Sequence, residues 1–530
     1  MFKQTKIFVV MKHFALFLLA LNAFSPLQAE VVQQVRILGG SQSDVAKHII
    51  PASAGGFLLV GYTESTDGDI SVQHHGGRDA WVVRLNDSGD ILWQLLLGGS
   101  GDDEATGVVE MAADGWIVGG HTCSADGDFS LHQGSVETAD LFIVKISDQG
   151  DLLWTQTLGT GYDDRANDVV RVGTNRIVLG ATVQGQSSDL EVIQGLKDMW
   201  LAELDGNGNV LWERAYGGSL HDELHHLGVG TDGSIWLAGC SDSFSGLAGD
   251  REGVVMRVDS DGELLWTVSL GSEADHDDAV MSSFLVEENG DTRIGFSTTG
   301  SDDGLNCTPH GSVMIAHLNA DGEWVDTSCF GGSAWEYART VVPDGNGHYW
   351  ILGDTRSTDG DVNAGSSSAT TVNKGWLLRC DNSGSLSVNY LLGGPGAEYA
   401  VGLAAGNSSQ VLAVLNTLDQ ESPQAGDSSV VSDVLLVSVS EGPASVQEQL
   451  AESGLLVFPN PASDQVIVEI TDSESDDDRE EVIIRDITGR VIFRELSRAS
   501  RMVIPVNDWR AGVYFLTRSG SAQAVRLVVE

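Results

Sequence analysis

The sequence predicts an all-β protein in which a seven-bladed β-propeller precedes a small β-sandwich. Three observations predict this fold. A Leu-Gly-Gly phrase or a close variant recurs at intervals of about 60 residues through the middle of the chain. Each interval contains four short runs rich in β-branched and aromatic residues, bounded by Gly, Asp and Asn. After the last interval the composition changes and a second set of short apolar runs begins.

The first glycine of the recurring phrase marks each repeat. These anchor glycines are Gly39, Gly98, Gly159, Gly217, Gly271, Gly331 and Gly393. Four antiparallel strands per repeat, repeated seven times, correspond to the blades of a propeller. Length alone would suggest three or four domains, but the repeat replaces that estimate with one large ring.

The second repeat shows the order of its elements. An apolar stretch around Val108 gives the first strand, and residues 116–120 follow the turn Asp114-Gly115 as the second. A long polar loop leads to the third strand at residues 141–146, and residues 152–158 form the fourth. We expect the long loops to gather on one face of the ring, where any chemistry would lie.

The two ends of the repeat region predict how the ring closes. The seventh repeat has a third strand at residues 433–440 but no fourth strand before the composition changes. Residues 31–38 lie directly before the first anchor glycine, where fourth strands lie in the other repeats. This segment is therefore expected to complete the last blade, which leaves no open edge in the ring.

The termini predict an exported protein. Lys12 and His13 precede an apolar run over residues 14–24, and Leu27-Gln28-Ala29 resembles a cleavage site, so residues 1–29 are expected to be a Sec signal peptide. Residues 30–440 are assigned to the propeller, 441–453 to a linker and 454–530 to the C-terminal domain. We expect no membrane span in the mature chain, because no later apolar run is long enough.

The acidic composition excludes some partners. The 29 Lys and Arg residues against 76 Asp and Glu residues give a net charge of −47. Nucleic-acid binding needs clustered cations, so it is not expected, and anionic membrane surfaces are disfavoured for the same reason. With 42% hydrophobic residues the chain can still bury a core.

A carboxylate recurs five residues beyond six of the anchor glycines. These residues are Asp44, Asp103, Asp164, Asp222, Glu336 and Glu398. One interpretation is a ring of carboxylates at the channel mouth that binds a cation or a polyhydroxylated ligand. We favour the other, in which each carboxylate accepts hydrogen bonds within its own blade.

Three long loops carry an Asp-Gly-Asp string. The residues are Asp67 and Asp69, Asp126 and Asp128, and Asp359 and Asp361. Such oxygen-rich loops could bind calcium, but they lack the complete ligand series of a calcium loop. Asx turns are the interpretation that we favour, and no other cofactor is expected.

Two further motifs are discounted. Residues 228–233 match GxGxxG but fall at a hairpin turn rather than between a strand and a helix. The segment His221-Asp222-Glu223-Leu224-His225 resembles a zinc-protease helix, but Asp222 replaces the required Glu and the segment enters a strand. The five cysteines are an odd number, so at least one is unpaired within the chain.

The last residues resemble a known export signal. The string Phe458-Pro459-Asn460-Pro461 opens the domain, a turn follows with Gly489 near its end, and Gly512-Val513-Tyr514 begins a late strand. This order resembles the type A C-terminal sorting domain of type IX secretion substrates. The resemblance implies that the secretion machinery and its sortase are partners. It further implies passage across the outer membrane, removal of the tail, and release or attachment to surface lipopolysaccharide.

No catalytic constellation interrupts the repeat. We therefore expect a secreted or cell-surface propeller that is a non-enzymatic binding or interaction module for a glycan or protein ligand. Two alternatives stay open. A propeller-type extracellular hydrolase or lyase could use loop carboxylates as acid and base on a polysaccharide. A structural component of the cell-surface layer would need neither a ligand nor catalysis.

Overall fold

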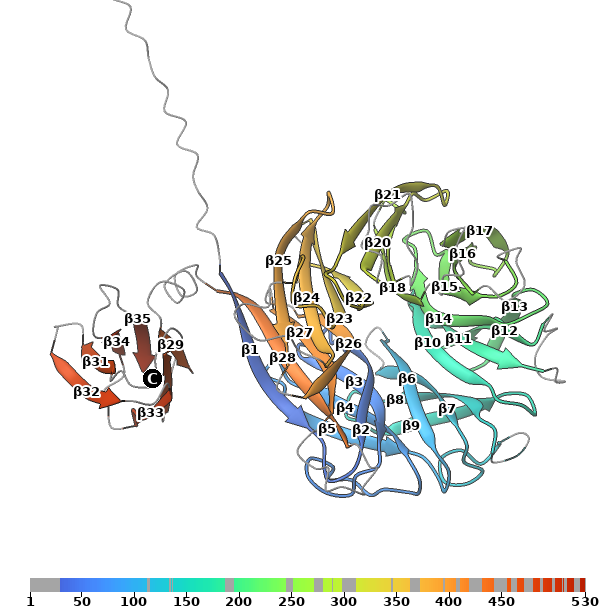
Figure 1. Ribbon diagram of the computed structural model, residues 1–530. Helices are drawn as coiled ribbons and strands as arrows, with labels where there is room; N and C mark the ends of the chain where they lie inside the picture. The colour runs from blue at the N-terminus through green and yellow to red at the C-terminus, as the bar shows by residue number, and fades with distance from the viewer. Residues whose placement is uncertain are drawn as a thin grey trace, which may run out of the picture. The chain divides into compact units, whose positions relative to one another are not determined.

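The computed structural model of the chain has β-strands as the regular secondary structure of its described residues (Figure 1). It describes residues 29–111, 115–132, 135, 137–185, 195–244, 251–270, 280–287, 289–297, 311–344, 347–362, 372–393, 396–406, 410–418, 431–442, 455–458, 465–470, 480–486, 490–497, 501–507, 509, 512–518 and 525–529. The proposed signal peptide, apart from Ala29, and nearly all of the proposed linker lie outside these ranges.

Seven four-stranded sheets form the blades of the propeller, as predicted. The first strands are β2 (Asp44–Pro51), β6 (Asp103–Glu110), β10 (Arg165–Val172), β14 (Asp222–Val229), β18 (Val280–Val286), β22 (Glu336–Pro343) and β26 (Ala397–Ala405). The second strands are β3 (Phe57–Thr63), β7 (Trp116–Thr122), β11 (Arg176–Gln184), β15 (Ile235–Ser241), β19 (Thr292–Ser297), β23 (His348–Thr355) and β27 (Gln410–Leu418).

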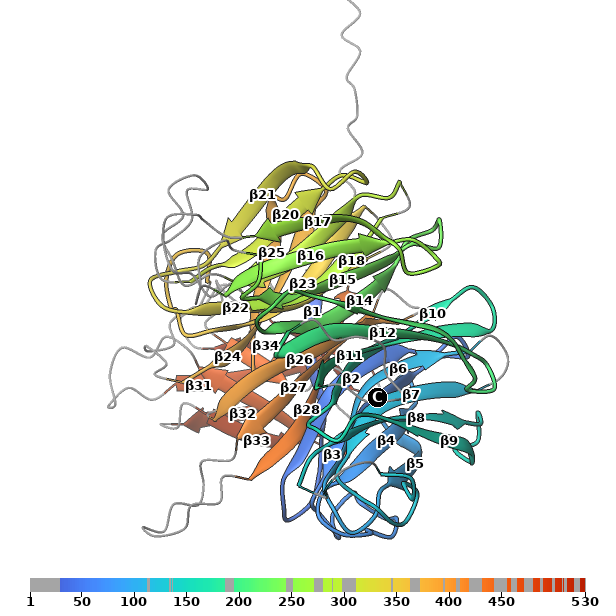
Figure 2. The same ribbon diagram turned by 90° about the vertical axis from the view of Figure 1, so that its right-hand side faces the viewer.

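The outer half of each blade completes the sheet. The third strands are β4 (Asp79–Leu85), β8 (Asp140–Ile146), β12 (Lys197–Asp205), β16 (Glu252–Val258), β20 (Val313–Leu318), β24 (Lys374–Asp381) and β28 (Ser432–Gly442). The fourth strands are β5 (Ile91–Leu97), β9 (Leu152–Leu158), β13 (Val210–Tyr216), β17 (Leu264–Leu270), β21 (Trp324–Phe330), β25 (Leu386–Leu392) and β1 (Ala29–Leu38). Figure 2 shows the blades following one another in chain order, from blue through green and yellow.

The first strand of the chain closes the ring. The seventh sheet has the order β1-β28-β27-β26, so β1 is the fourth strand of blade 7. The first strands of blades 1 and 7, β2 and β26, contact each other. This arrangement confirms the closure predicted from residues 31–38. The propeller, Val32–Ser440, forms one of the two compact units of the chain.

The middle strands carry the core because both of their faces are covered by neighbouring blades. Every residue of β4, β7 and β8 is buried, whereas first strands such as β2 alternate between buried and more exposed positions. Such continuous apolar runs are typical of strands that are buried on both faces. The predicted hairpin at residues 228–233 is confirmed as the turn between β14 and β15, with Gly233 at φ +82°.

Tryptophans on the fourth strands pack between blades. Trp93 lies over the turn glycine Gly150 of blade 2, where a Cβ atom would come within 2.9 Å of the indole ring. Trp154 and Gly208 repeat this contact at the next interface, as do two further pairs, Trp212 with Gly262 and Trp266 with Gly322. Gly150 has φ +89°, so the turn itself also favours glycine.

The C-terminal domain is a small β-sandwich, as predicted. One sheet has the order β29-β30-β33 and the other β32-β31-β34-β35. The strands are β29 (Leu455–Phe458), β30 (Gln465–Ile470), β31 (Glu480–Asp486), β32 (Val491–Ser497), β33 (Arg501–Pro505), β34 (Gly512–Arg518) and β35 (Val525–Val529). Val468, Ile484 and Leu516 contribute to a core between the sheets. No helix in the described ranges is long and apolar enough to cross a membrane.

Candidate functional site

The six recurring carboxylates lie in the interior of their blades. All six side chains are fully buried at the beginning of the first strand. Asp103 accepts hydrogen bonds from the Gly99 amide at 2.9 Å, from the Ser124 hydroxyl at 2.8 Å and from the Thr122 hydroxyl. These bonds tie the anchor loop to the end of the second strand. We call such a carboxylate, whose hydrogen bonds join two segments of one blade, an intrablade staple.

The other carboxylates vary this pattern. Asp44 and Asp222 each accept one backbone amide and two hydroxyl groups. Asp164 accepts the Thr160 hydroxyl and two amides, and Glu336 the Thr355 hydroxyl and the Gly332 amide. Glu398 instead pairs with the Lys374 ammonium group at 2.6 Å. All six carboxylates are therefore engaged within the protein.

In several blades a second buried carboxylate lies near the anchor glycine, opposite the staple carboxylate. A Cβ atom on Gly98 would come within 2.6 Å of Asp79 and 2.7 Å of Asp103. A side chain at this anchor would therefore have to displace the two carboxylates. Burial raises the pKa of Asp103, and the nearby charge of Asp79 adds to this rise, although hydrogen bonds oppose it.

The Asp-Gly-Asp loops clamp the anchor from the outside. Asp126 accepts the Ser100 amide at 2.7 Å and Asp128 the Gly98 amide at 3.1 Å. Equivalent carboxylates accept the same bonds in two other blades: Asp67 from the Ser41 amide, Asp69 from Gly39, Asp359 from Ser333 and Asp361 from Gly331. The loop glycine has a positive φ, +62° at Gly127, and lies against the anchor backbone. Each loop thus uses its carboxylates on backbone amides, and calcium binding stays a prediction.

A cavity of about 770 Å³ occupies the centre of the ring. Residues from the first strands of all seven blades line it. Its volume falls in the range of small-molecule sites. The wall is mostly aliphatic, with a few charged groups. The sequence predicted the channel as part of the fold but did not predict which polar side chains line it.

Cations outnumber carboxylates on this wall. Lys47, Arg171 and Arg339 line the cavity together with Glu110 and Asp168. Lys47 pairs with Glu104 at 2.7 Å and Arg339 with Asp354 at 2.9 Å. The guanidinium of Arg171 donates to the Glu110 carbonyl at 2.9 Å, and it has no carboxylate partner among the described residues. Two of the three cations on the wall are therefore neutralised by carboxylates, and Arg171 supplies the positive charge that a ligand could meet.

Two histidines lie in the cavity on either side of Asp168. His48, Asp168 and His226 each lie four residues beyond the staple of their blade, and the His226 Nδ1 atom is 3.6 Å from the Asp168 carboxylate. Blade 2 has Gly107 at this level, so no side chain separates His48 from Asp168. Burial lowers the pKa of His48, and Asp168 opposes this only in part. In the described part of the chain, His48 Nδ1 is buried without a hydrogen-bond partner.

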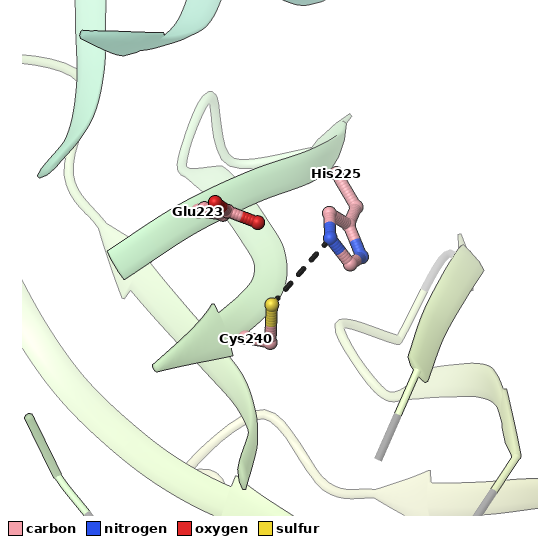
Figure 3. A group of neighbouring side chains, drawn as sticks. All are labelled: Glu223, His225 and Cys240. Carbon is pink, nitrogen blue, oxygen red and sulfur yellow. Dashed lines mark hydrogen bonds between the residues drawn. The ribbon is translucent and has the colours of Figure 1, made fainter. Parts of the chain in front are cut away.

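The discounted zinc-protease motif lies on β14, confirming that it is not a helix. Glu223 and His225 nevertheless lie beside Cys240 of β15 (Figure 3). Burial tends to raise the pKa of Glu223, but Arg251 and Lys197 outweigh it and hold the pKa below its ordinary value. Sequence reasoning missed Cys240. The available signal was its place between Gly239 and Ser241, in a pattern that other second strands repeat.

The cysteines differ in whether they form a disulfide. Cys329 is disulfide-bonded, whereas Cys123, Cys240 and Cys380 are not. Cys307 lies outside the described residues.

The residues of the sorting motif are described only in part. Pro459, Asn460, Pro461 and Gly489 lie outside the described residues. Gly512 begins β34, where it pairs with Val529 of β35. Tyr514 is buried in the core of the sandwich, with its ring 5.0 Å from that of Trp509.

Comparisons with solved structures give distant likenesses. Sqt1 from Chaetomium thermophilum is 12% identical with a TM-score of 0.40, over 77% of this chain and 99% of that chain. A puromycin hydrolase is 14% identical with a TM-score of 0.44, over 71% of this chain and 51% of that one. Aldose sugar dehydrogenase from Streptomyces coelicolor is 11% identical with a TM-score of 0.34, over 78% and 100%. Curated proteins yielded no match.

A family model matches the end of the chain. Residues 456–530 match the secretion system C-terminal sorting domain, which is the region where the sequence resembled that family. The match covers the β-sandwich and none of the propeller. The protein is thus a seven-bladed propeller followed by a C-terminal sorting domain, and that domain directs type IX secretion to the cell surface or the extracellular space.

Proposed function

We propose that the propeller is a non-enzymatic binding module that takes an acidic oligosaccharide in its central channel. The observation that carries the proposal is a central cavity whose wall holds the guanidinium of Arg171, in a strongly acidic chain. Arg171 supplies a guanidinium without a carboxylate partner among the described residues, and His48 supplies a buried ring nitrogen without a hydrogen-bond partner there. An acidic sugar offers both the carboxylates and the hydroxyl groups that these side chains would bind.

Calorimetric titration of the full chain with oligomers of a hexuronic acid tests this proposal. Neutral hexose oligomers of the same length are the ligand control. We expect the acidic oligomer to bind at least about 10-fold more tightly, with an affinity that falls as salt is added. Equal affinity for both oligomers, or no binding of either, would overturn the proposal.

The Arg171→Gln variant locates the site. It should weaken binding of the acidic oligomer by about 10-fold, because it removes a charge-assisted hydrogen bond. Arg214→Gln is the matched control, since Arg214 lies on the outer strand β13 and pairs with Glu263. Analysis of the mixture by mass spectrometry tests the enzymatic alternative. Shortened or unsaturated oligomers that disappear in a channel variant would contradict the non-enzymatic assignment.

We further propose that the mature chain begins at Glu30 and loses its tail. The basic and apolar start of the sequence and the sorting-domain match support these two processing events. Mass analysis of the exported protein should give a chain without residues 1–29 and without the sorting domain. An exported chain that keeps both segments would contradict this view of its maturation.

A further inference from the structure

Three potential metal ligands meet in blade 4, outside the central channel. Glu223 and Cys240 are direct cross-strand partners on β14 and β15. His225 is the extra residue of a β-bulge between Leu224 and His226. A bulge re-aims the side chain that it carries. One ligand atom from each of the three residues lies within 4.8 Å of the others. Figure 3 shows the three side chains beside one another.

The spacing of two of these atoms suits a tetrahedral cation of the zinc type. The Cys240 Sγ and His225 Nε2 atoms are 3.6 Å apart. Zinc bonds of about 2.3 Å to sulfur and about 2.0 Å to nitrogen, at a tetrahedral angle, place those atoms about 3.5 Å apart. A thiolate, an imidazole and a carboxylate are also ligands that zinc prefers, whereas calcium and magnesium prefer oxygen ligands alone.

The surroundings orient the carboxylate. Arg251 contacts the Glu223 Oε2 atom at 2.8 Å, and Lys197 lies 3.3 Å from Oε1. Arg251 also lies 3.7 Å from Asp242, which offsets its charge. Arg251 can therefore keep its contact with Oε2 while Oε1 binds a cation and the longer Lys197 contact is given up. Contacts of this kind commonly fix the orientation of metal ligands.

The cluster is closed on one side and open on the other. Cys240 is only 2% exposed, whereas Glu223 and His225 line a cavity of about 260 Å³. A cation bound by the three residues would thus keep a fourth position for water on the cavity side. Blade 2 has Glu104, Thr106 and His121 at the corresponding positions, so its set lacks a thiol and a third ligand.

We propose that Glu223, His225 and Cys240 form a binding site for a single zinc-type divalent cation. The Cys240 sulfur binds as a thiolate, so its proton passes to solvent as the metal–sulfur bond forms. The carboxylate and the neutral imidazole bind without releasing a proton at neutral pH. The site is independent of the channel and of any ligand bound there.

Cobalt is the probe because its thiolate complexes are coloured. The full chain, freed of metal with a chelator, is titrated with Co²⁺ and then with Zn²⁺. We expect one equivalent to give a thiolate-to-cobalt charge-transfer band and the visible bands of tetrahedral cobalt, both lost as zinc displaces cobalt. About one proton should be released per cation. Calcium should neither give nor displace the signal.

Variants identify the ligands. Cys240→Ser should abolish the charge-transfer band, and His225→Gln should weaken zinc binding by about 10-fold to 100-fold. Cys123→Ser and His221→Gln are the matched controls and should bind as the unchanged chain does. Circular dichroism verifies that each variant is folded. No cobalt–thiolate band in the unchanged chain, or the same band in Cys240→Ser, would overturn the proposal.

Discussion

Blades 2 and 4 carry different side chains at the same cross-strand positions of the sheet. In blade 2, Glu104 lies opposite His121, and in blade 4, Glu223 lies opposite Cys240. Lys47 of blade 1 pairs with Glu104 at 2.7 Å, while Arg165 of blade 3 donates to the His121 ring at 3.2 Å. Cations from both neighbours therefore complete the cluster in blade 2.

Blade 4 combines a cation of its own with one from a neighbour. Its carboxylate contacts Arg251 of the same blade and Lys197 of blade 3, and a thiol and an imidazole lie beside it. Two side chains that differ between the blades thus replace a threonine and a histidine by two potential metal ligands. The repeat conserves the backbone and the staple, and function can vary at the positions that surround them.

The largest expected effect concerns what the two blades share. Asp103→Ala in blade 2 and Asp222→Ala in blade 4 should each lower the free energy of unfolding by about 4 kcal/mol, because buried donors lose their charged acceptor. Urea unfolding followed by tryptophan fluorescence measures this, since all tryptophans but Trp509 lie in the propeller. If only one of the two variants loses stability, the two aspartates do not have equivalent roles.

The next effect belongs to blade 2 alone. Burial lowers the pKa of His121 from 6.5 to about 4. Below pH 6.5 the unfolded chain takes up a proton that the folded chain refuses until about pH 4, so stability falls through this window, by about 3 kcal/mol in total. His121→Gln should lose this part of the pH dependence of urea unfolding.

His221→Gln is the control for this measurement, because that side chain is partly exposed. It should follow the pH curve of the unchanged chain. Identical curves for His121→Gln and the unchanged chain would show that His121 is not held neutral by burial.

A smaller effect tests the ion pairs. Glu104→Gln should cost about 1 kcal/mol, because Lys47 is more than one third exposed and solvent screens the pair. The difference from the unchanged chain should shrink in high salt when thermal unfolding is followed by circular dichroism. A loss that does not depend on salt would assign the effect to packing instead.

The smallest effect distinguishes a staple pair from a calcium site. Asp79→Asn should change the free energy of unfolding at pH 7 by less than about 1 kcal/mol. It removes one of two buried carboxylates around Gly98 but also weakens the hydrogen bond that Asp79 accepts from the His75 amide at 2.6 Å. If calcium bridges Asp79 and Asp103, the same variant should be less stable in calcium than the unchanged chain. Melting temperatures with calcium and with chelator separate these outcomes.

Much of the fold could be predicted because it depends on local patterns. The recurrence of the anchor glycines sets the number of blades, and residues 31–38 occupy the place of a missing fourth strand. The tryptophans of the fourth strands, such as Trp93, recur at one position and pack on the next blade. Each of these features repeats, so it can be recognised several times in one sequence.

The site was harder to predict because it depends on departures from the repeat. His48, Asp168 and His226 come from three blades, and their proximity depends on the absence of a side chain at Gly107. Cys240 meets His225 at a bulge that the first strands of the blades share, so what is particular to blade 4 is the pair of side chains there. Spacing along the chain records neither cross-strand register nor which blades face each other.

The closing strand has a consequence for the order of folding. β1 must pair with β28, which lies about 400 residues farther along the chain. Closing a loop of that length costs roughly 5 kcal/mol of chain entropy, and such distant pairs form slowly. The seventh blade is therefore expected to assemble last. Until then the ring stays open, and a substitution that weakens β1 or β28 is expected to slow its closure.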